Sequence, residues 1–293
     1  QGHTAPTEYT IKSNQAVRES LPLNEQQSFS NAKRGLVATT ASLTVTQADG
    51  NVIWDQPARD FIQGEAPNSV NPSLWRQAKL NNLPGLFRVT EGVYQLRNFD
   101  LSNMTLIKGK TGWIVVDPLT SAETAGAAMA LAKSHLDVGQ ISAIIFTHSH
   151  VDHFAGVLGV VSIEEVRKDA IRIIAPDGFM HEATSENVLA GVAMGRRAGY
   201  MTGRYLAKSK RGHVDTGLGQ GLPFGTLGIL QPTEIINKTP QYLVVDGVNF
   251  IFQNVPDSEA PAELTFYLPD LKAFCGGEII NHTMHNLYTL RGA

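Results

Sequence analysis

A short run that is apolar apart from Ser142, residues 141–146, leads directly into a segment that contains three histidines and one aspartate. The segment is Thr147-His148-Ser149-His150-Val151-Asp152-His153. A nearly continuous apolar run of this length is typical of a strand buried on both faces. We therefore expect the four ionisable side chains to form a site at the end of a buried strand.

Metal binding is the chemistry that these four side chains favour. Imidazole nitrogen and carboxylate oxygen suit zinc at neutral pH. One ion can hardly take four ligands from so short a loop, so we expect two adjacent ions, with His148 and His150 on one and Asp152 and His153 on the other. Two such ions would clamp a water, lower its pKa and produce a nucleophile. A polar loop with unrelated histidines is disfavoured, because three of the 9 histidines fall in this window.

The sequence around the loop alternates between strand and helix patterns. We expect strands at 92–97, 104–107, 113–116, 171–175, 243–245, 249–252, 264–268 and 273–275, and helices at 121–136 and 163–168. Strands that alternate with helices, together with paired hairpins, predict a mixed α/β sandwich. Residues 177–225 are rich in Gly, Arg and Met. They predict a helix and a long surface excursion that lines a pocket.

The first 85 residues differ in character. They are polar, contain Gln-, Asn- and Pro-rich stretches, and show few regular periods apart from a short strand expected at 52–54. We expect residues 1–85 to form an irregular N-terminal extension that wraps a neighbouring surface and could reach a partner subunit. The catalytic domain is expected to cover residues 86–293.

Composition excludes several classes of protein. The net charge is -3, and no basic face for nucleic-acid binding is apparent. No stretch approaches the ~20 apolar residues that span a bilayer. Cys275 is the only cysteine, so no disulfide can form within the chain. The chain starts at Gln1, which fits removal of a signal segment or trimming, and we expect a periplasmic or secreted bacterial protein.

The HxHxDH pattern after a strand resembles the metallo-β-lactamase superfamily. The strand that ends in Val115-Val116-Asp117-Pro118 is also similar to the opening of that superfamily. The resemblance implies an αββα sandwich with the metal site at one sheet edge. Most members supply a third histidine from a later loop and a bridging aspartate after the next hairpin. This chain has glutamates at both places, Glu259 and Glu278.

The double replacement resembles the alkyl sulfatase branch, and so does the segment 281–292. The resemblance implies two Zn²⁺ ions, with Glu259 completing the site of the first two histidines and Glu278 bridging both ions. Asp152 and Glu278 are then the expected catalytic carboxylates. Glu263 is the alternative to Glu259, and is otherwise expected to brace a ligand.

The same branch implies that Asn286 and Arg291 hold the sulfate group of a substrate. Arginine presents a forked pair of donors that matches planar sets of oxygens. His282 and His285 lie in the same segment and are candidates for a proton donor or for support of a ligand. Five glycines between positions 203 and 221 suggest a loop that covers an alkyl chain.

The functional hypothesis is hydrolysis of alkyl sulfate esters to an alcohol and inorganic sulfate. The alternatives are another hydrolase of the superfamily (a lactonase, thioesterase or β-lactamase), against which the two glutamates argue, and a non-catalytic metal-binding fragment. The resemblance also implies a further histidine ligand, a helical dimerisation region and a small lipid-carrier-like domain after Ala293. We therefore expect a chain truncated at its C-terminus, which forms a homodimer or associates with the missing C-terminal portion.

Overall fold

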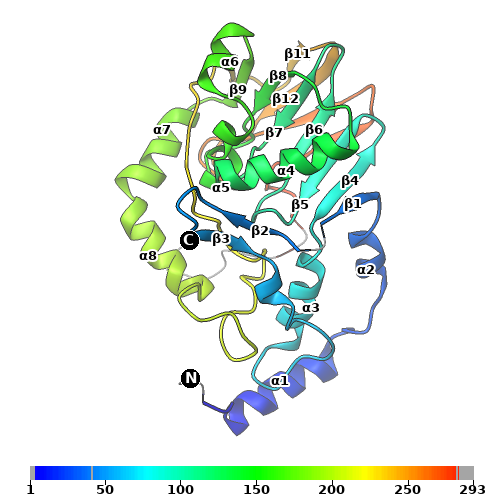
Figure 1. Cartoon of the computed structure of the whole chain (residues 1–293), viewed down its shortest axis with the longest axis vertical. Coiled ribbons are helices and arrows are strands. Elements are labelled where there is room, and N and C mark those ends of the chain that lie inside the picture. Colours follow the sequence, from blue (N-terminus) through cyan, green and yellow to red (C-terminus); the bar gives the residue numbers. More distant parts are fainter. Residues whose placement is uncertain (1–3, 41, 282, 284–293) are drawn as a thin grey trace.

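The structure, a computed structural model, describes residues 4–40, 42–281 and 283 (Figure 1). Eight strands form the larger sheet, in the order β1 (Leu36–Thr39), β4 (Gly85–Thr90), β5 (Val93–Arg97), β6 (Met104–Lys108), β7 (Trp113–Val116), β8 (Ile141–Ile145), β9 (Arg172–Pro176) and β10 (Glu234–Ile236). Four form the smaller sheet, in the order β11 (Gln241–Val245), β12 (Val248–Asn254), β13 (Leu264–Leu268) and β14 (Ala273–Cys275). Strands β7 to β10 are parallel to one another.

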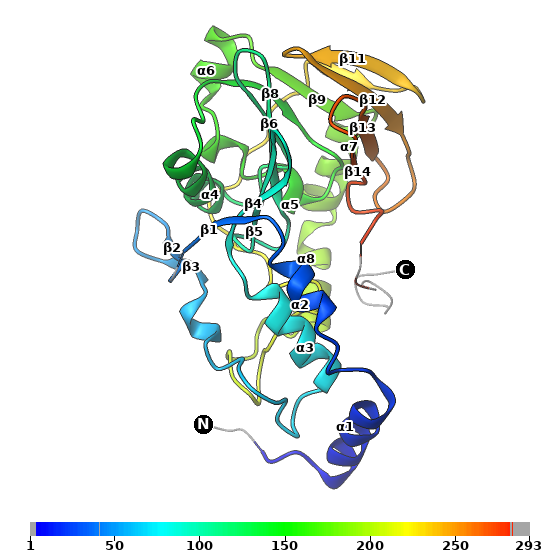
Figure 2. The same cartoon turned by 90° about the vertical axis from the view of Figure 1, so that its right-hand side faces the viewer.

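The two faces of the larger sheet are buried against different layers. Along β7, Val115 belongs to one core and Ile114 to the other, as the alternation of side chains in a strand requires. Helix α4 (Ala122–His135) covers the first core, and the smaller sheet covers the second through rings such as Phe252. Figure 2 shows the smaller sheet, in orange and red, on the side of the larger sheet opposite α4. The predicted mixed α/β sandwich is confirmed.

The segment after β9 contains the predicted helix and excursion. It forms α7 (Phe179–Thr184), the π-helical segment η3 (Ser185–Leu189) and α8 (Gly191–Thr202), followed by residues 203–233, which are fully described and contain no named helix or strand. Shorter elements near the loop are α5 (Val151–Phe154), η2 (Val157–Gly159) and α6 (Ile163–Lys168).

The N-terminal extension is more regular than expected. It contains α1 (Glu8–Ser20), α2 (Gln27–Ala32), β1, β2 (Thr44–Thr46), β3 (Val52–Asp55), η1 (Pro57–Arg59) and α3 (Pro72–Asn81). The expected strand at 52–54 lies within β3, but the expectation of an otherwise irregular segment is wrong. Helix α1 buries only Asn14, so no buried apolar side chain marks it as a core-facing helix. Strand β1 pairs with β4, which makes the extension part of the larger sheet.

Among the described residues, no helix combines the length and the apolar character needed to cross a membrane.

Candidate metal centre

The histidine-rich loop begins where two parallel strands of the larger sheet end side by side. The loop follows β8, and Asp117 follows the neighbouring strand β7. The backbone N–H and the hydroxyl of Thr147 donate to Asp117, at 2.8 Å and 2.6 Å. The carboxylate after β7 therefore anchors the first residue of the loop after β8.

The six residues predicted as metal ligands converge at this edge. The smaller sheet contributes two of them, because Glu259 lies between β12 and β13 and Glu278 follows β14. These six side chains form two groups whose ligand atoms lie within 4.8 Å of one another: His148, His150, Glu259 and Glu278 in one, and Asp152, His153 and Glu278 in the other. Glu278 belongs to both groups, as a bridging carboxylate must. His148 and His153 also form such a group with Asp117.

The surroundings of His148 test whether a cation fits the first group. Its Nδ1 atom lies 2.9 Å from the hydroxyl oxygen of Thr147, which already donates its proton to Asp117. We therefore assign the proton to Nδ1 and the lone pair to Nε2. This Nε2 atom is buried, lies 3.5 Å from both Glu259 and Glu278, and has no hydrogen-bond partner among the described residues. A lone pair facing two carboxylates calls for a cation between them.

His153 repeats this arrangement in the second group. Its Nδ1 atom lies 2.8 Å from Asp117 Oδ2, so Nδ1–H donates to a carboxylate and Nε2 carries the lone pair. The Nε2 atom lies 3.4 Å from Asp152 and 3.3 Å from Glu278. No role for Asp117 was predicted from the sequence. The sequence signal that could have identified Asp117 was its position directly after a buried strand, which neighbours the strand before the loop.

The pKa values of the buried groups reflect the concentration of carboxylates. Burial by itself lowers the pKa of His153, but Asp152 and Asp117 raise it well above its usual value. Burial likewise opposes ionisation of His150, and Glu259 raises the pKa of that ring. Burial raises the pKa of Asp152, and the neighbouring His153 more than offsets this, so the pKa is lowered. The electrostatic field at this site thus stabilises positively charged groups.

Glu263 has a different role from Glu259. The side chain of Glu263 is fully buried, and its Oε2 atom accepts hydrogen bonds from the hydroxyl of Ser258 at 2.9 Å and from the backbone N–H groups of Glu259 at 2.9 Å and Ala260 at 3.0 Å. Glu259 instead reaches the histidines, with its Oε2 atom 2.9 Å from His150 Nδ1. Glu263 belongs to neither ligand group and fixes the backbone that presents Glu259.

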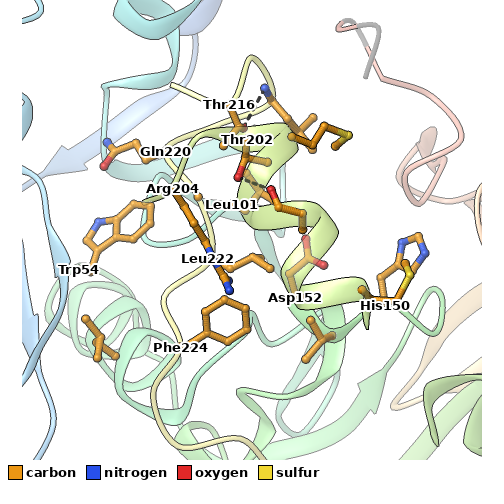
Figure 3. A pocket seen from close by; sticks show the side chains of 18 of the residues that line it. Trp54, Leu101, His150, Asp152, Thr202, Arg204, Thr216, Gln220, Leu222 and Phe224 are labelled. Carbon is orange, nitrogen blue, oxygen red and sulfur yellow. Dashed lines mark hydrogen bonds between the residues drawn. The ribbon is translucent and has the colours of Figure 1, made fainter. Parts of the chain in front are cut away.

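A cavity of about 730 Å³ adjoins the ligand groups. Figure 3 shows His150 and Asp152 on one side of it, Trp54 and Gln220 on the opposite side, and Leu222 and Phe224 between them. Helix α8 and the following excursion supply much of its wall, including Met194, Leu206, Leu218 and Leu227. The prediction that residues 177–225 line a pocket is confirmed.

A second cavity, of about 790 Å³, reaches the same centre from a more polar part of the molecule. Asp152 and Glu278 line both cavities. Polar residues of the second cavity include Arg76, Asn81, Gln95, Arg97 and Asn98. The two carboxylates therefore separate an apolar space from a polar one.

The predicted sulfate-binding residues, Asn286 and Arg291, lie outside the described residues, and so do His282 and His285.

Comparisons with known proteins give consistent results. Residues 97–245 match the family described as Metallo-beta-lactamase superfamily. The chain is 45% identical to the linear primary-alkylsulfatase of Pseudomonas sp, over 98% of this chain and 43% of that protein. It is 42% identical to the alkyl/aryl-sulfatase BDS1 of Saccharomyces cerevisiae, over 97% of this chain and 44% of that protein. Among solved structures, the inverting sec-alkylsulfatase Pisa1 from Pseudomonas sp. is similar to this chain with a TM-score of 0.91 and 39% identity. The match covers 99% of this chain and 46% of the Pisa1 chain. The chain thus spans less than half the length of these relatives.

Proposed function

Because the chain belongs to the metallo-beta-lactamase superfamily, we propose that it carries the catalytic metal centre of an alkyl sulfatase. Such an enzyme hydrolyses an alkyl sulfate ester to an alcohol and inorganic sulfate. The observation that carries the proposal is the pair of ligand groups joined at Glu278, next to an apolar cavity. The proteins described as alkylsulfatases match nearly the whole chain, which supports this substrate class.

We propose that the superfamily's divalent metal site is a pair of zinc ions here. His148, His150 and Glu259 would hold one ion, Asp152 and His153 the other, and Glu278 both. Imidazole nitrogens favour zinc over magnesium or calcium, which prefer oxygen ligands. When bound, such a pair lowers the pKa of a water and so supplies a nucleophile at neutral pH.

The protein's own groups would orient the reactants. Asp152 and Glu278 contact both cavities, so we propose that their carboxylates orient the attacking water toward the ester. The apolar cavity would bind the alkyl chain, because burying each methylene contributes roughly 0.8 kcal/mol. Asn286 and Arg291 stay proposed as the sulfate-binding pair on the sequence resemblance. A homodimer, or association with a C-terminal portion, also stays proposed.

Metal reconstitution with a sulfate assay tests the proposal. The protein is stripped with a chelator and reloaded with zinc, metal is counted by mass spectrometry, and sulfate released from dodecyl sulfate is measured by ion chromatography. We expect about two zinc ions per chain and loss of sulfate release on chelation. Hydrolysis in ¹⁸O-labelled water identifies the bond broken, because label in the alcohol means attack at carbon and label in sulfate means attack at sulfur.

Two histidine variants provide the matched comparison. His148→Ala should abolish sulfate release, whereas His181→Ala should not, because the His181 side chain is 80% exposed and outside both ligand groups. A zinc-loaded protein that cleaves nitrocefin or a lactone and leaves dodecyl sulfate intact would refute the proposed substrate class.

A further inference from the structure

The imidazole ring of His150 has a carboxylate next to each of its nitrogens. Its Nδ1 atom lies 2.9 Å from Glu259 Oε2, and its Nε2 atom lies 3.6 Å from Glu186 Oε2. Glu259 belongs to the ligand groups, whereas Glu186 does not. Nδ1 is therefore on the side of the proposed metal ion, and Nε2 is on the side of Glu186.

Glu186 lies on a segment that is packed against both ends of the histidine-rich loop. The loop is preceded by Phe146 and followed by Phe154. The ring of Phe179, at the start of α7, stacks on Phe146 with centroids 5.0 Å apart and meets Phe154 edge-on at 5.4 Å. Helix α7 continues into the π-helical segment η3 that carries Glu186. Aromatic packing thus ties the position of Glu186 to the loop that carries His150.

The form of the backbone at Glu186 is unusual. π-Helical turns are rare and occur frequently at functional sites, because the extra residue redirects a side chain. Here the π-helical turn joins two α-helices and carries Glu186 into the wall of the apolar cavity, beside His150. The Glu186 side chain is 22% exposed and that of His150 is 10% exposed, so water screens the pair only partly.

A neutral imidazole has one N–H and one lone pair, and a carboxylate next to one nitrogen favours the proton there. We propose that Glu186 is a positioning residue, which keeps the proton of His150 on Nε2 and directs the Nδ1 lone pair at the first metal ion. This inference rests on the metal centre of the proposed function. Carboxylates that hold metal-binding histidines in this way raise the basicity of the ligand nitrogen. The same segment would then shape the apolar cavity and hold a metal ligand.

Zinc affinity measured by competition with a chromophoric chelator tests this role without an activity assay. We expect Glu186→Leu to weaken one of the two zinc sites by ~10-fold or more. Glu186→Gln should retain much of the affinity, because its amide oxygen is also an acceptor beside Nε2. Glu182→Leu is the matched control, since Glu182 lies on α7 with its Oε1 atom 3.8 Å from His181 Nε2, outside both ligand groups. Its zinc affinity should equal that of the unaltered protein.

Two further measurements separate positioning from folding and from the proposed function. The metal-free Glu186→Leu and Glu182→Leu proteins should melt at the same temperature, and a selective loss of stability in Glu186→Leu would overturn the inference. In ¹¹³Cd-substituted protein, scalar coupling should connect the metal to Nδ1 of His150, and coupling to Nε2 would overturn it. Wild-type zinc affinity in Glu186→Leu would refute this inference alone, whereas no zinc uptake by the unaltered protein would refute the proposed metal centre.

Discussion

The carboxylate of Asp117 sets the ring of His153, with Oδ2 lying 2.8 Å from Nδ1. The same oxygen accepts the hydroxyl proton of Thr147, whose oxygen in turn accepts the Nδ1 proton of His148. One side chain at the end of β7 therefore orients two histidines, one from each of the two groups that Glu278 joins. Each is left with its Nε2 lone pair directed at Glu278.

Replacing Asp117 with asparagine should weaken zinc binding by ~10–100-fold, because the acceptor for His153 Nδ1–H loses its charge. Asp117 has a φ of 53°, and asparagine tolerates this left-handed conformation as well as aspartate does. The control is Asp246→Asn, because Asp246 also has a positive φ, of 46°, and accepts from the N–H and hydroxyl of Thr111 far from the ligand groups. Chelator competition should show a change only in Asp117→Asn, and equal zinc affinities in the two variants would contradict the role of Asp117.

Removing the Glu263 carboxylate should destabilise the loop that presents Glu259. In Glu263→Ala, the N–H groups of Glu259 and Ala260 lose their acceptor, and each unpaired buried donor costs about 1–3 kcal/mol. Urea denaturation of the metal-free chain should therefore give a free energy of unfolding roughly 2–4 kcal/mol lower. Ser258→Ala removes only one of the three bonds to Glu263, together with the contact of the Ser258 hydroxyl with the Val255 carbonyl, and should cost about 1 kcal/mol. Equal losses in the two variants would argue against this role.

Filling the apolar cavity should weaken the binding of alkyl sulfates with a long chain more than that of alkyl sulfates with a short chain. Gly195 lies on α8, lines the cavity, and has open space where a side chain would begin. Gly195→Leu should raise KM for dodecyl sulfate by ~10-fold or more, because it displaces two or three methylenes worth roughly 0.8 kcal/mol each. Hexyl sulfate should be much less affected. Gly139→Leu, at an exposed position with equally open space, should leave KM unchanged for both substrates. Parallel changes for both substrates in Gly195→Leu would exclude the cavity as the alkyl site.

A buried aspartate away from the ligand groups should make stability depend on pH. Burial raises the pKa of Asp215 to about 7, against the lowering effects of the Gly217 N–H and Arg59. The folded chain therefore keeps this proton between about pH 4 and 7, where the unfolded chain has lost it. The contribution of Asp215 to stability thus falls as pH rises through that range and is constant above it.

Asp215→Asn removes this titration. The free energy of unfolding of the metal-free variant, relative to the unaltered chain, should rise from pH 4 to pH 7 and then level off. Denaturation curves at several pH values measure this difference directly, because all other groups titrate in both proteins. A difference that does not vary with pH would show that Asp215 keeps its usual pKa in the folded protein.

Local patterns in the sequence were sufficient to predict the structure at the centre of the molecule. The apolar run before the loop became β8, and the four ionisable side chains after it lie together at the end of that strand. Strand and helix patterns around the loop also predicted the α/β sandwich. A strand with one buried face alternates apolar and polar side chains, whereas a strand buried on both faces is nearly all apolar. Helices α1 and α2 of the N-terminal extension were missed because they bury no apolar side chain that would mark a core-facing side.

The sequence by itself determined which residue types gather after β8 and that they suit a pair of metal ions. Only the tertiary structure decided the partners that come from elsewhere in the chain. It separated Glu259 from Glu263, added Asp117 behind His153, and brought Glu186 to His150. These relationships join residues on different strands and helices, whose approach depends on how the two sheets and α7 pack. Spacing along the chain carries no information about such contacts, because side-chain packing between layers, and not local backbone preference, brings the atoms together.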